Sequence, residues 1–176
     1  MSIRIAPINQ NNQIDLEKLD SNKFMVESKL IVTFESGSFS YKVTPVEGYE
    51  KTYAKVHLDL SAFDGEEKAI FLAYYDNQIA GRIILKKSWN NYAIIDIEVD
   101  QAHRRRGVGT ALIKAASEWA RKRNLPGLLA ESQDINVGAC KLYETCGFQL
   151  GGFDVNFYKN LDPPLEEIAL FWYLIF

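Results

Sequence analysis

The sequence predicts one mixed α/β (α+β) domain with a mostly antiparallel central sheet flanked by helices. Strand-like and helix-like segments alternate between residues 92 and 148, which gives a βαβα pattern. Paired strand-like segments joined by short turns precede and follow this region. The chain has 176 residues and is 47% hydrophobic, so it can bury a full core without a second domain.

The first third of the chain is less patterned than the rest. Residues 1–27 are polar with weak periodicity, whereas Lys29–Phe34 and Phe39–Val43 flank the turn signal Glu35-Ser36-Gly37-Ser38 and predict a hairpin. A helix is compatible with Gly48–Leu60, and an exposed acidic turn is expected at Asp64-Gly65-Glu66-Glu67.

Short runs rich in β-branched and aromatic residues predict the strands of the central sheet. Asn and Asp residues bound several of them, as turns require. The predicted strands are Lys68–Tyr75 and Gln78–Leu85, joined at Asp76-Asn77, then Tyr92–Val99, Gly127–Ser132, Phe148–Tyr158 and Ile168–Phe176.

Two segments carry apolar residues at helical spacing. Thr110–Arg123 is the first, and its basic end at Arg121–Arg123 suits the negative end of a helix dipole. The second begins at Asn136 and places Ala139, Leu142, Tyr143 and Cys146 on one face, with Gly147 as the residue that ends the helix.

The turn between the strand Tyr92–Val99 and the first helix predicts an anion site. Arg104-Arg105-Arg106-Gly107-Val108-Gly109-Thr110 would direct backbone N–H groups and the positive end of the helix dipole at one spot, where a diphosphate fits. The third glycine of a dinucleotide fingerprint is missing, and so is the Gly-Lys-Ser/Thr of a P-loop. A simple tight turn with solvated basic residues is the alternative.

The spacing of Arg104, Gly107 and Gly109 resembles the (Gln/Arg)-x-x-Gly-x-(Gly/Ala) signature of the GNAT superfamily of acyl-CoA-dependent N-acyltransferases. The later segment from Asn136 to Phe148 resembles the next helix of the same superfamily. This resemblance implies a GNAT-like sheet that is splayed at its central strands to admit acyl-CoA. It also implies acetyl-CoA as acyl donor, with no metal.

The resemblance also implies roles for individual residues. The N–H of Ile97 would hold the thioester carbonyl, and Ile97–Val99 would pair with the pantetheine amides as an added strand. Asn136 would contact the pantetheine arm, and the Tyr143 phenol, protonated at neutral pH, would donate to sulfur. The residues expected to bind acetyl-CoA are Ile97, Glu98, Val99, Arg104, Arg105, Arg106, Gly107, Val108, Gly109, Thr110, Asn136, Ala139 and Tyr143.

The general base is less defined than the acid. Glu131 has the spacing from Asn136 of the base in the branch that acetylates the N-terminal alanine of a ribosomal protein. Asp96 and Glu98 share one face of a strand and could bind the amine or relay its proton through water. His57 and His103 are interpreted as surface or packing residues.

Further segments resemble the streptothricin acetyltransferases of Gram-positive bacteria, which acetylate the β-lysine group of that antibiotic. They include Trp89–Asp96, the stretch Glu131-Ser132-Gln133-Asp134 and the Phe171-Trp172-Tyr173-Leu174 ending. The resemblance runs from about Ile70 onward, so residues 68–176 are expected to form the acetyl-CoA-binding core and 1–60 the acceptor side. Carboxylates that could attract a cationic acceptor are Asp96, Glu98, Glu131, Asp134 and Asp154.

Other classes of function are weighed against this one. A polyamine, another cationic compound or a protein N-terminus could be the acceptor, and a catalytically silent acyl-CoA sensor is a third reading. The net charge of −3 without a long basic stripe argues against nucleic acid, and the longest apolar run, Ala169–Phe176, is too short to span a bilayer. We expect a cytoplasmic protein in which Cys140 and Cys146 are reduced; a homodimer is compatible with the sequence.

Overall fold

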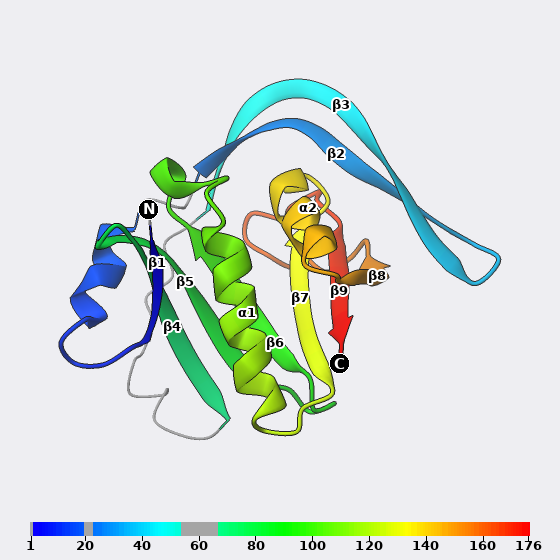
Figure 1. Ribbon diagram of the computed structural model, residues 1–176. Coiled ribbons are helices and arrows are strands. Elements are labelled where there is room, and N and C mark those ends of the chain that lie inside the picture. The colour runs from blue at the N-terminus through cyan, green and yellow to red at the C-terminus, as the bar shows by residue number, and fades with distance from the viewer. Residues whose placement is uncertain (1, 20–22, 54–66) are drawn as a thin grey trace. The chain divides into compact units, whose positions relative to one another are not determined.

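The computed structural model describes residues 2–19, 23–53 and 67–176. They form two compact units. The first takes in residues 1–23, 52–128 and 176, and the second takes in Phe24–Lys51 and Leu129–Ile175. Figure 1 labels the helices and strands along the chain.

The first unit is an antiparallel sheet with one helix on it. Its strands follow the order β1 (Ile3–Pro7), β4 (Lys68–Tyr75), β5 (Gln78–Lys87) and β6 (Ala93–Val99), and each neighbouring pair is antiparallel. The helix α1 (Val108–Arg121) packs across these strands (Figure 1). Two short 3-10 helices, η1 (Gln13–Lys18) and η3 (Gln101–His103), complete the unit.

Gly81 on β5 lets α1 approach the sheet closely. A Cβ atom at this position would lie 3.3 Å from side-chain atoms of Val108 and Leu112, and only 2.5 Å from the backbone oxygen of Glu98. The face of β5 and β6 that carries Gly81 therefore faces α1, and the alternate residues point to the opposite face. This alternation fixes where the polar side chains of both strands emerge.

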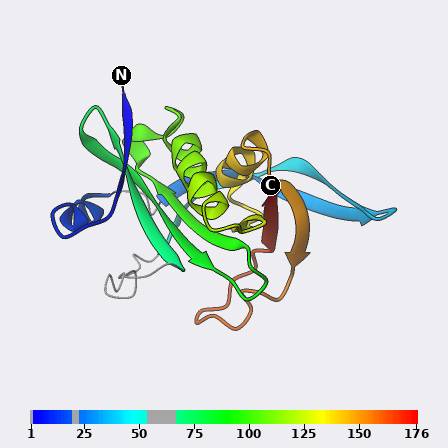
Figure 2. The ribbon, with the colours of Figure 1, turned by 60° about the horizontal axis from the view of Figure 1, so that its bottom comes forward.

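The second unit joins a short sheet, a two-stranded ribbon and a helix. The sheet has the order β7 (Gly127–Gln133), β9 (Ala169–Ile175), β8 (Gln149–Asp154), and β8 pairs with β9 antiparallel. The ribbon consists of β2 (Lys23–Glu35) and β3 (Ser38–Thr52). The helix α2 (Val137–Thr145) lies beside β7 and β9 (Figure 2). Its Tyr143 packs against Trp172, so α2 covers the side of β9 that carries Trp172.

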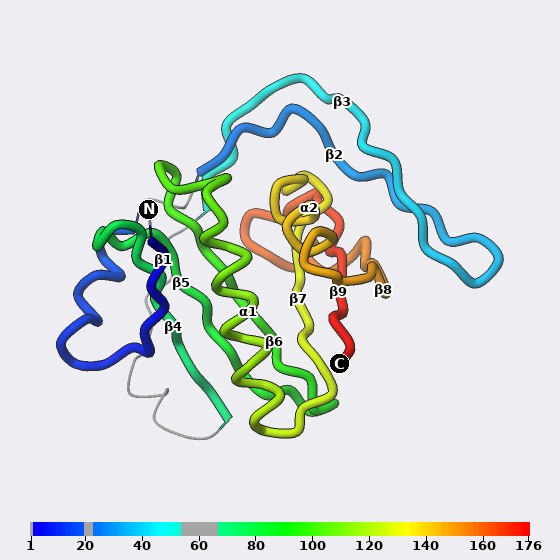
Figure 3. The backbone as a smooth tube through the Cα atoms, in the orientation of Figure 1, coloured from blue at the N-terminus to red at the C-terminus, as the bar shows by residue number. Residues whose placement is uncertain are grey.

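Most predicted elements are confirmed. The strand at Lys68–Tyr75 has its predicted bounds, and the turn at Asp76-Asn77 uses positive φ angles of 46° and 68°. Both helices form, although α1 begins two residues before the predicted Thr110 because Gly107 already caps it. The chain path in Figure 3 runs from α1 directly into β7, as the βαβα pattern predicts.

Three expectations differ from the structure, and a fourth falls outside the residues that it describes. The polar segment 1–27 contains β1, whose Ile3 and Ile5 pair with β4, and it also contains the start of β2. The hairpin strands are longer than Lys29–Phe34 and Phe39–Val43. Residues 48–52 are strand rather than helix, and the acidic turn up to position 66, like His57, lies outside the described residues.

The strand predicted for Phe148–Tyr158 ends early. β8 stops at Asp154, whose Oδ1 accepts a hydrogen bond of 2.7 Å from the N–H of Asn156. An Asp side chain that binds the backbone two residues on favours a turn over a continuing strand. Tyr158 therefore lies in the connection between β8 and β9 and not on the sheet.

Candidate active site

The predicted anion site stands at the N-terminal end of α1. Gly107 is the N-cap, with a left-handed φ of 84°, and Arg105 is also left-handed at 61°. The first helical hydrogen bond runs 3.0 Å from the N–H of Ala111 to the carbonyl of Gly107. The N–H groups of the three residues between them therefore lie at the positive end of the helix dipole. The N-cap residue is a glycine, so it has no side chain that could accept a hydrogen bond from them.

The three arginines of this turn are placed differently. Arg104 donates from Nε to the carbonyl of Val99 at 3.3 Å, which fastens the turn to the end of β6. The guanidinium of Arg106 lies 5.3 Å from the centre of the Tyr75 ring, and Arg105 is exposed. The turn thus combines backbone donors with positive charge, a combination that suits a diphosphate.

Asp100 fixes the approach to this turn. Its Oδ1 accepts hydrogen bonds from the N–H of Ala102 at 3.0 Å and, at 2.9 Å, pairs with Nδ1 of His103. His103 also packs against Tyr75, with ring centroids 5.7 Å apart. Its placement agrees with the packing role expected for it.

A buried arginine joins the two carboxylates of β6. Arg82 on β5 is 4% exposed and donates to both oxygens of Glu98, and its Nη1 lies 3.3 Å from Oδ2 of Asp96. The register pairs Arg82 with Glu98 directly across the two strands. Because Arg82 follows Gly81, this group lies on the face of β5 and β6 opposite to α1.

Asp96 and Glu98 differ in their surroundings. Desolvation raises the pKa of the Asp96 carboxyl above its ordinary value; the Arg82 guanidinium opposes the rise and the Glu98 carboxylate adds to it. Solvent still reaches 57% of the Asp96 side chain, which limits the rise. Asp96 is thus the carboxylate with more solvent access, and Glu98 is the one that Arg82 engages through both oxygens.

In the second unit, Asn136 is the N-cap of α2. Its Oδ1 accepts a 3.1 Å hydrogen bond from the N–H of Ala139. Because the amide oxygen faces the helix, the NH₂ group faces away from it. Asn136 and Ala139, both expected to bind the pantetheine arm, are therefore held together by the cap.

Tyr143 lies on the buried face of α2. It is 3% exposed and packs against Phe148 and Trp172, with ring centroids 5.3 and 6.2 Å away. Trp172 donates from Nε1 to the hydroxyl of Ser132 at 3.1 Å. These contacts fix the ring of Tyr143 against the sheet.

Glu131 extends from the other face of β7. Its Oε1 accepts a hydrogen bond from the hydroxyl of Tyr158. The next residue, Ser132, points towards α2, where its hydroxyl contacts Trp172 and the thiol of Cys140. Because neighbouring strand residues alternate faces, Glu131 and Tyr143 lie on opposite faces of the second unit's sheet.

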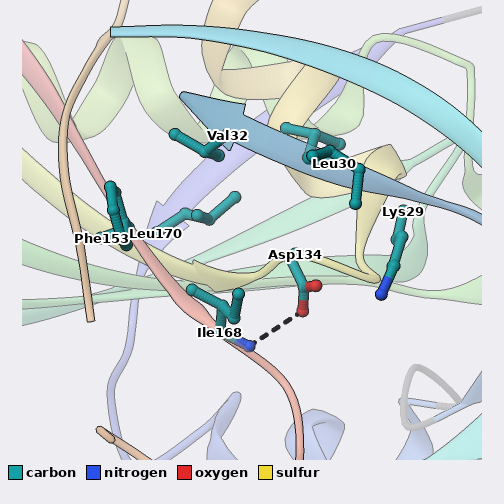
Figure 4. A pocket seen from close by; sticks show the side chains of 8 residues that line it. Lys29, Leu30, Val32, Asp134, Phe153, Ile168 and Leu170 are labelled. Atoms are coloured by element: carbon teal, nitrogen blue, oxygen red, sulfur yellow. Dashed lines mark hydrogen bonds between the residues drawn. The ribbon is translucent and has the colours of Figure 1, made fainter. Parts of the chain in front are cut away.

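Asp134 has a structural role. It is buried, its Oδ1 accepts a 3.0 Å hydrogen bond from the N–H of Ile168, and desolvation raises its pKa. Figure 4 shows it beside Lys29 in a cavity of about 100 Å³, lined by Lys29, Leu30, Ile31, Val32, Asp134, Phe153, Ile168 and Leu170. Ligand pockets usually have ~300 Å³ or more, so this cavity does not suit an antibiotic.

The sequence missed three polar partners. Arg82 sits in a hydrophobic strand pattern, and nothing in the sequence pairs it with Glu98, 16 residues away. The sequence pattern places Tyr158 in a strand and Ser132 at a strand end, and it indicates no partner for either. Only their contacts across the fold identify them.

Both cysteines lie at α2, Cys140 within the helix and Cys146 as its C-cap. Cys140 and Cys146 are free, and burial raises the pKa of Cys140 to about 11. Among residues 2–19, 23–53 and 67–176, no three His, Cys, Asp or Glu side chains are grouped to hold a metal ion. In the same segments, no helix is long and apolar enough to cross a membrane.

Comparison with known proteins adds independent findings. The acetyltransferase (GNAT) family matches residues 34–148. Streptothricin acetyltransferase A of Bacillus subtilis strain 168 is 41% identical over 92% of this chain and 96% of its own, and a streptothricin acetyltransferase of Escherichia coli is 35% identical over 98% and 95%. A candidate streptothricin acetyltransferase of Bacillus anthracis strain Ames, solved in complex with acetyl coenzyme A, is 40% identical with a TM-score of 0.89, covering 99% of this chain and 100% of that one.

Proposed function

This chain belongs to the GNAT family of acetyltransferases, and we propose that it transfers the acetyl group of acetyl-CoA to an amine of the β-lysine arm of streptothricin. Acetylation removes a positive charge from the drug and should weaken its hold on an anionic target. The product is therefore expected to be less toxic, and the enzyme is expected to give resistance.

The similarity to streptothricin acetyltransferase A, 41% over 92% of the chain, carries the choice of substrate. GNAT motifs by themselves report the acyl donor and not the acceptor. The match extends beyond residues 34–148, where the family model aligns, and so includes segments that could form an acceptor site.

The donor end is assigned to the turn at Arg104–Thr110. Acetyl-CoA, when bound, supplies the acetyl thioester. The left-handed Gly107 and the first N–H groups of α1 would hold its diphosphate, and the arginines would neutralise it. Ile97–Val99 would pair with the pantetheine amides, and the N–H of Ile97 would hold the carbonyl oxygen as charge builds on it.

Proton transfer is assigned to Glu131 and Tyr143. Glu131 would take a proton from the substrate ammonium, since only the neutral amine has a lone pair for attack. Tyr143 would donate its phenolic proton to the departing thiolate. Glu131 and Tyr143 lie on opposite faces of the second unit's sheet, so this assignment requires the amine and the thioester to reach the shared carbonyl carbon from opposite sides.

Asp96 and Glu98 are assigned the role of binding the acceptor's positive charges. Arg82 neutralises much of the charge of Glu98 by bonding both of its oxygens. Asp96 retains more solvent access and is the better candidate for binding a cationic side arm.

The reaction is proposed to take place in the cytoplasm. Both cysteines are free thiols, which agrees with that reducing compartment.

The proposal is tested by locating the added acetyl group. Purified protein is incubated with acetyl-CoA and streptothricin, and tandem mass spectrometry of the product finds which amine is acetylated. We expect one acetyl group on the β-lysine arm, and growth of a sensitive bacterium that expresses the chain in the presence of the drug. An unmodified drug, or an acetyl group elsewhere on it, would reject the assignment.

A further inference from the structure

We propose that Tyr158 is a positioning residue for the reaction, because its hydroxyl holds the Glu131 carboxylate as an oriented, ionised base. This inference rests on the proposed function in the role that it gives Glu131. It goes beyond that function in assigning a task to the connection between β8 and β9.

The contact is a hydrogen bond from the hydroxyl of Tyr158 to Oε1 of Glu131. Tyr158 is 6% exposed, so little water competes for its hydroxyl, whereas Glu131 is half-buried. A hydrogen bond to an ionised acceptor that is shielded from water is stronger than one between neutral groups. The bond therefore has enough strength to fix the carboxylate.

The surrounding chain holds Tyr158 in place. Its backbone oxygen accepts hydrogen bonds from the N–H groups of Leu161 at 3.2 Å and Leu165 at 3.3 Å. The neighbouring Phe157 packs edge-on against the Tyr158 ring at 5.1 Å and against Phe171 of β9 at 5.6 Å. The connection is thus anchored to the sheet beside the residue that reaches Glu131.

The side of the sheet matters for the proposal. Phe171 and Glu131 precede Trp172 and Ser132, which point towards α2, so the connection covers the face opposite to α2. A base on this face has no support from the helix that carries Tyr143. Tyr158 supplies that support from a segment 27 residues further along the chain.

The proton transfer does not consume the phenolic proton of Tyr158. One N–H bond of the substrate ammonium breaks, its proton goes to the Glu131 carboxylate, and the nitrogen keeps the electron pair with which it attacks. The phenolic O–H stays intact and only donates. Because such a bond favours the charged form of a carboxylate, its loss should let Glu131 hold a proton at higher pH.

The experiment replaces Tyr158 by phenylalanine, which keeps the ring and removes the donor. In Tyr158→Phe we expect kcat below neutral pH to fall about 10-fold, and the acidic limb of the pH profile to move up by about one pH unit. The KM for acetyl-CoA should stay within about twofold, because the donor site is untouched.

A second readout needs no substrate. Carbon NMR of labelled glutamate carboxyls follows the titration of Glu131, whose signal is the one missing from Glu131→Gln. Its midpoint should rise by about one pH unit in Tyr158→Phe. It should fall when 3-fluorotyrosine, a stronger donor, is placed at position 158, a variant that also preserves packing.

Tyr74→Phe is the matched control. Tyr74 is also 6% exposed and donates a 2.7 Å hydrogen bond to a carboxylate, that of Asp15. Its loss should leave the pH profile and the Glu131 midpoint unchanged. In a double-mutant cycle, Tyr158→Phe should add nothing to the loss caused by Glu131→Gln, because both act through one group.

An unchanged Glu131 midpoint in Tyr158→Phe, or losses that add in the cycle, would overturn the positioning role even if streptothricin is acetylated. A shifted midpoint in a protein that does not acetylate streptothricin would instead support the role of Tyr158 and reject the substrate. The two proposals can therefore fail separately.

Discussion

The turn at Arg104–Thr110 and the segment from Glu131 to Tyr143 hold their functional groups by different means. The turn relies on backbone: two left-handed residues, Arg105 and Gly107, and the open end of α1. The later segment relies on side chains, since Tyr158 holds Glu131, and Phe148 and Trp172 hold Tyr143. Replacement of a glycine by a branched residue should therefore damage the turn, and removal of a single hydroxyl should damage the later segment.

The largest effect is expected at Tyr143. Tyr143→Phe keeps the ring against Phe148 and Trp172 and removes only the hydroxyl, so kcat should fall about 10²-fold or more with a nearly unchanged Tm. Tyr41→Phe is the control, because Tyr41 also packs against Trp172 but donates to Glu144 on the outer side of α2. Equal kcat values in wild type and Tyr143→Phe would make Tyr143 a packing residue.

The backbone region should respond most to Gly109. In Gly109→Val a branched side chain enters the first turn of α1, and the dissociation constant for acetyl-CoA should rise about 30-fold, or about 2 kcal/mol. Arg123→Ala removes a charge from the other end of the helix, where Arg123 stacks on Trp119 at 4.3 Å. Calorimetry compares the dissociation constants of the two variants. Small, equal losses of acetyl-CoA affinity would contradict an anion site at this turn.

The smallest effect concerns Asp96 and depends on pH. The raised pKa of Asp96 means that its negative charge is lost at a higher pH than for an ordinary aspartate as the solution is acidified. The KM for streptothricin should therefore increase towards acid pH, and Asp96→Asn should raise it about fivefold near neutrality while abolishing that dependence.

Glu166→Gln is the control for charge alone, because Glu166 forms an exposed ion pair with Lys159. It should change the KM by less than about twofold. A similar rise in both variants would mean that the acceptor responds to net charge and not to the position of Asp96.

The sequence predicted what depends on local chemistry. Glycine spacing identified the turn before α1, because only certain residues adopt a left-handed φ with ease. Strand pairs with short turns were found for the same reason. Sequence patterns could not show that Arg82 binds Glu98 or that Trp172 binds Ser132 across 40 residues, because those contacts form only when distant strands align.

Two segments differ from their prediction, each for its own local reason. β1 is a five-residue strand at the edge of its sheet, too short for its alternation to stand out from a polar surrounding. The end of β8 depends on one Asp154 side chain that turns the chain aside. Hydrophobic periodicity shows neither feature. The early end of β8 matters more for function, because it places Tyr158 in the connection between β8 and β9.

The central claim is that this GNAT acetyltransferase recognises streptothricin itself. The most direct test is kcat/KM for streptothricin, measured by thiol release from acetyl-CoA, against spermidine, kanamycin and a peptide with N-terminal alanine. We expect streptothricin to be preferred by about 10²-fold or better, which corresponds to about 3 kcal/mol of selective contacts. Turnover of spermidine or the peptide at the same rate or faster would contradict the claim.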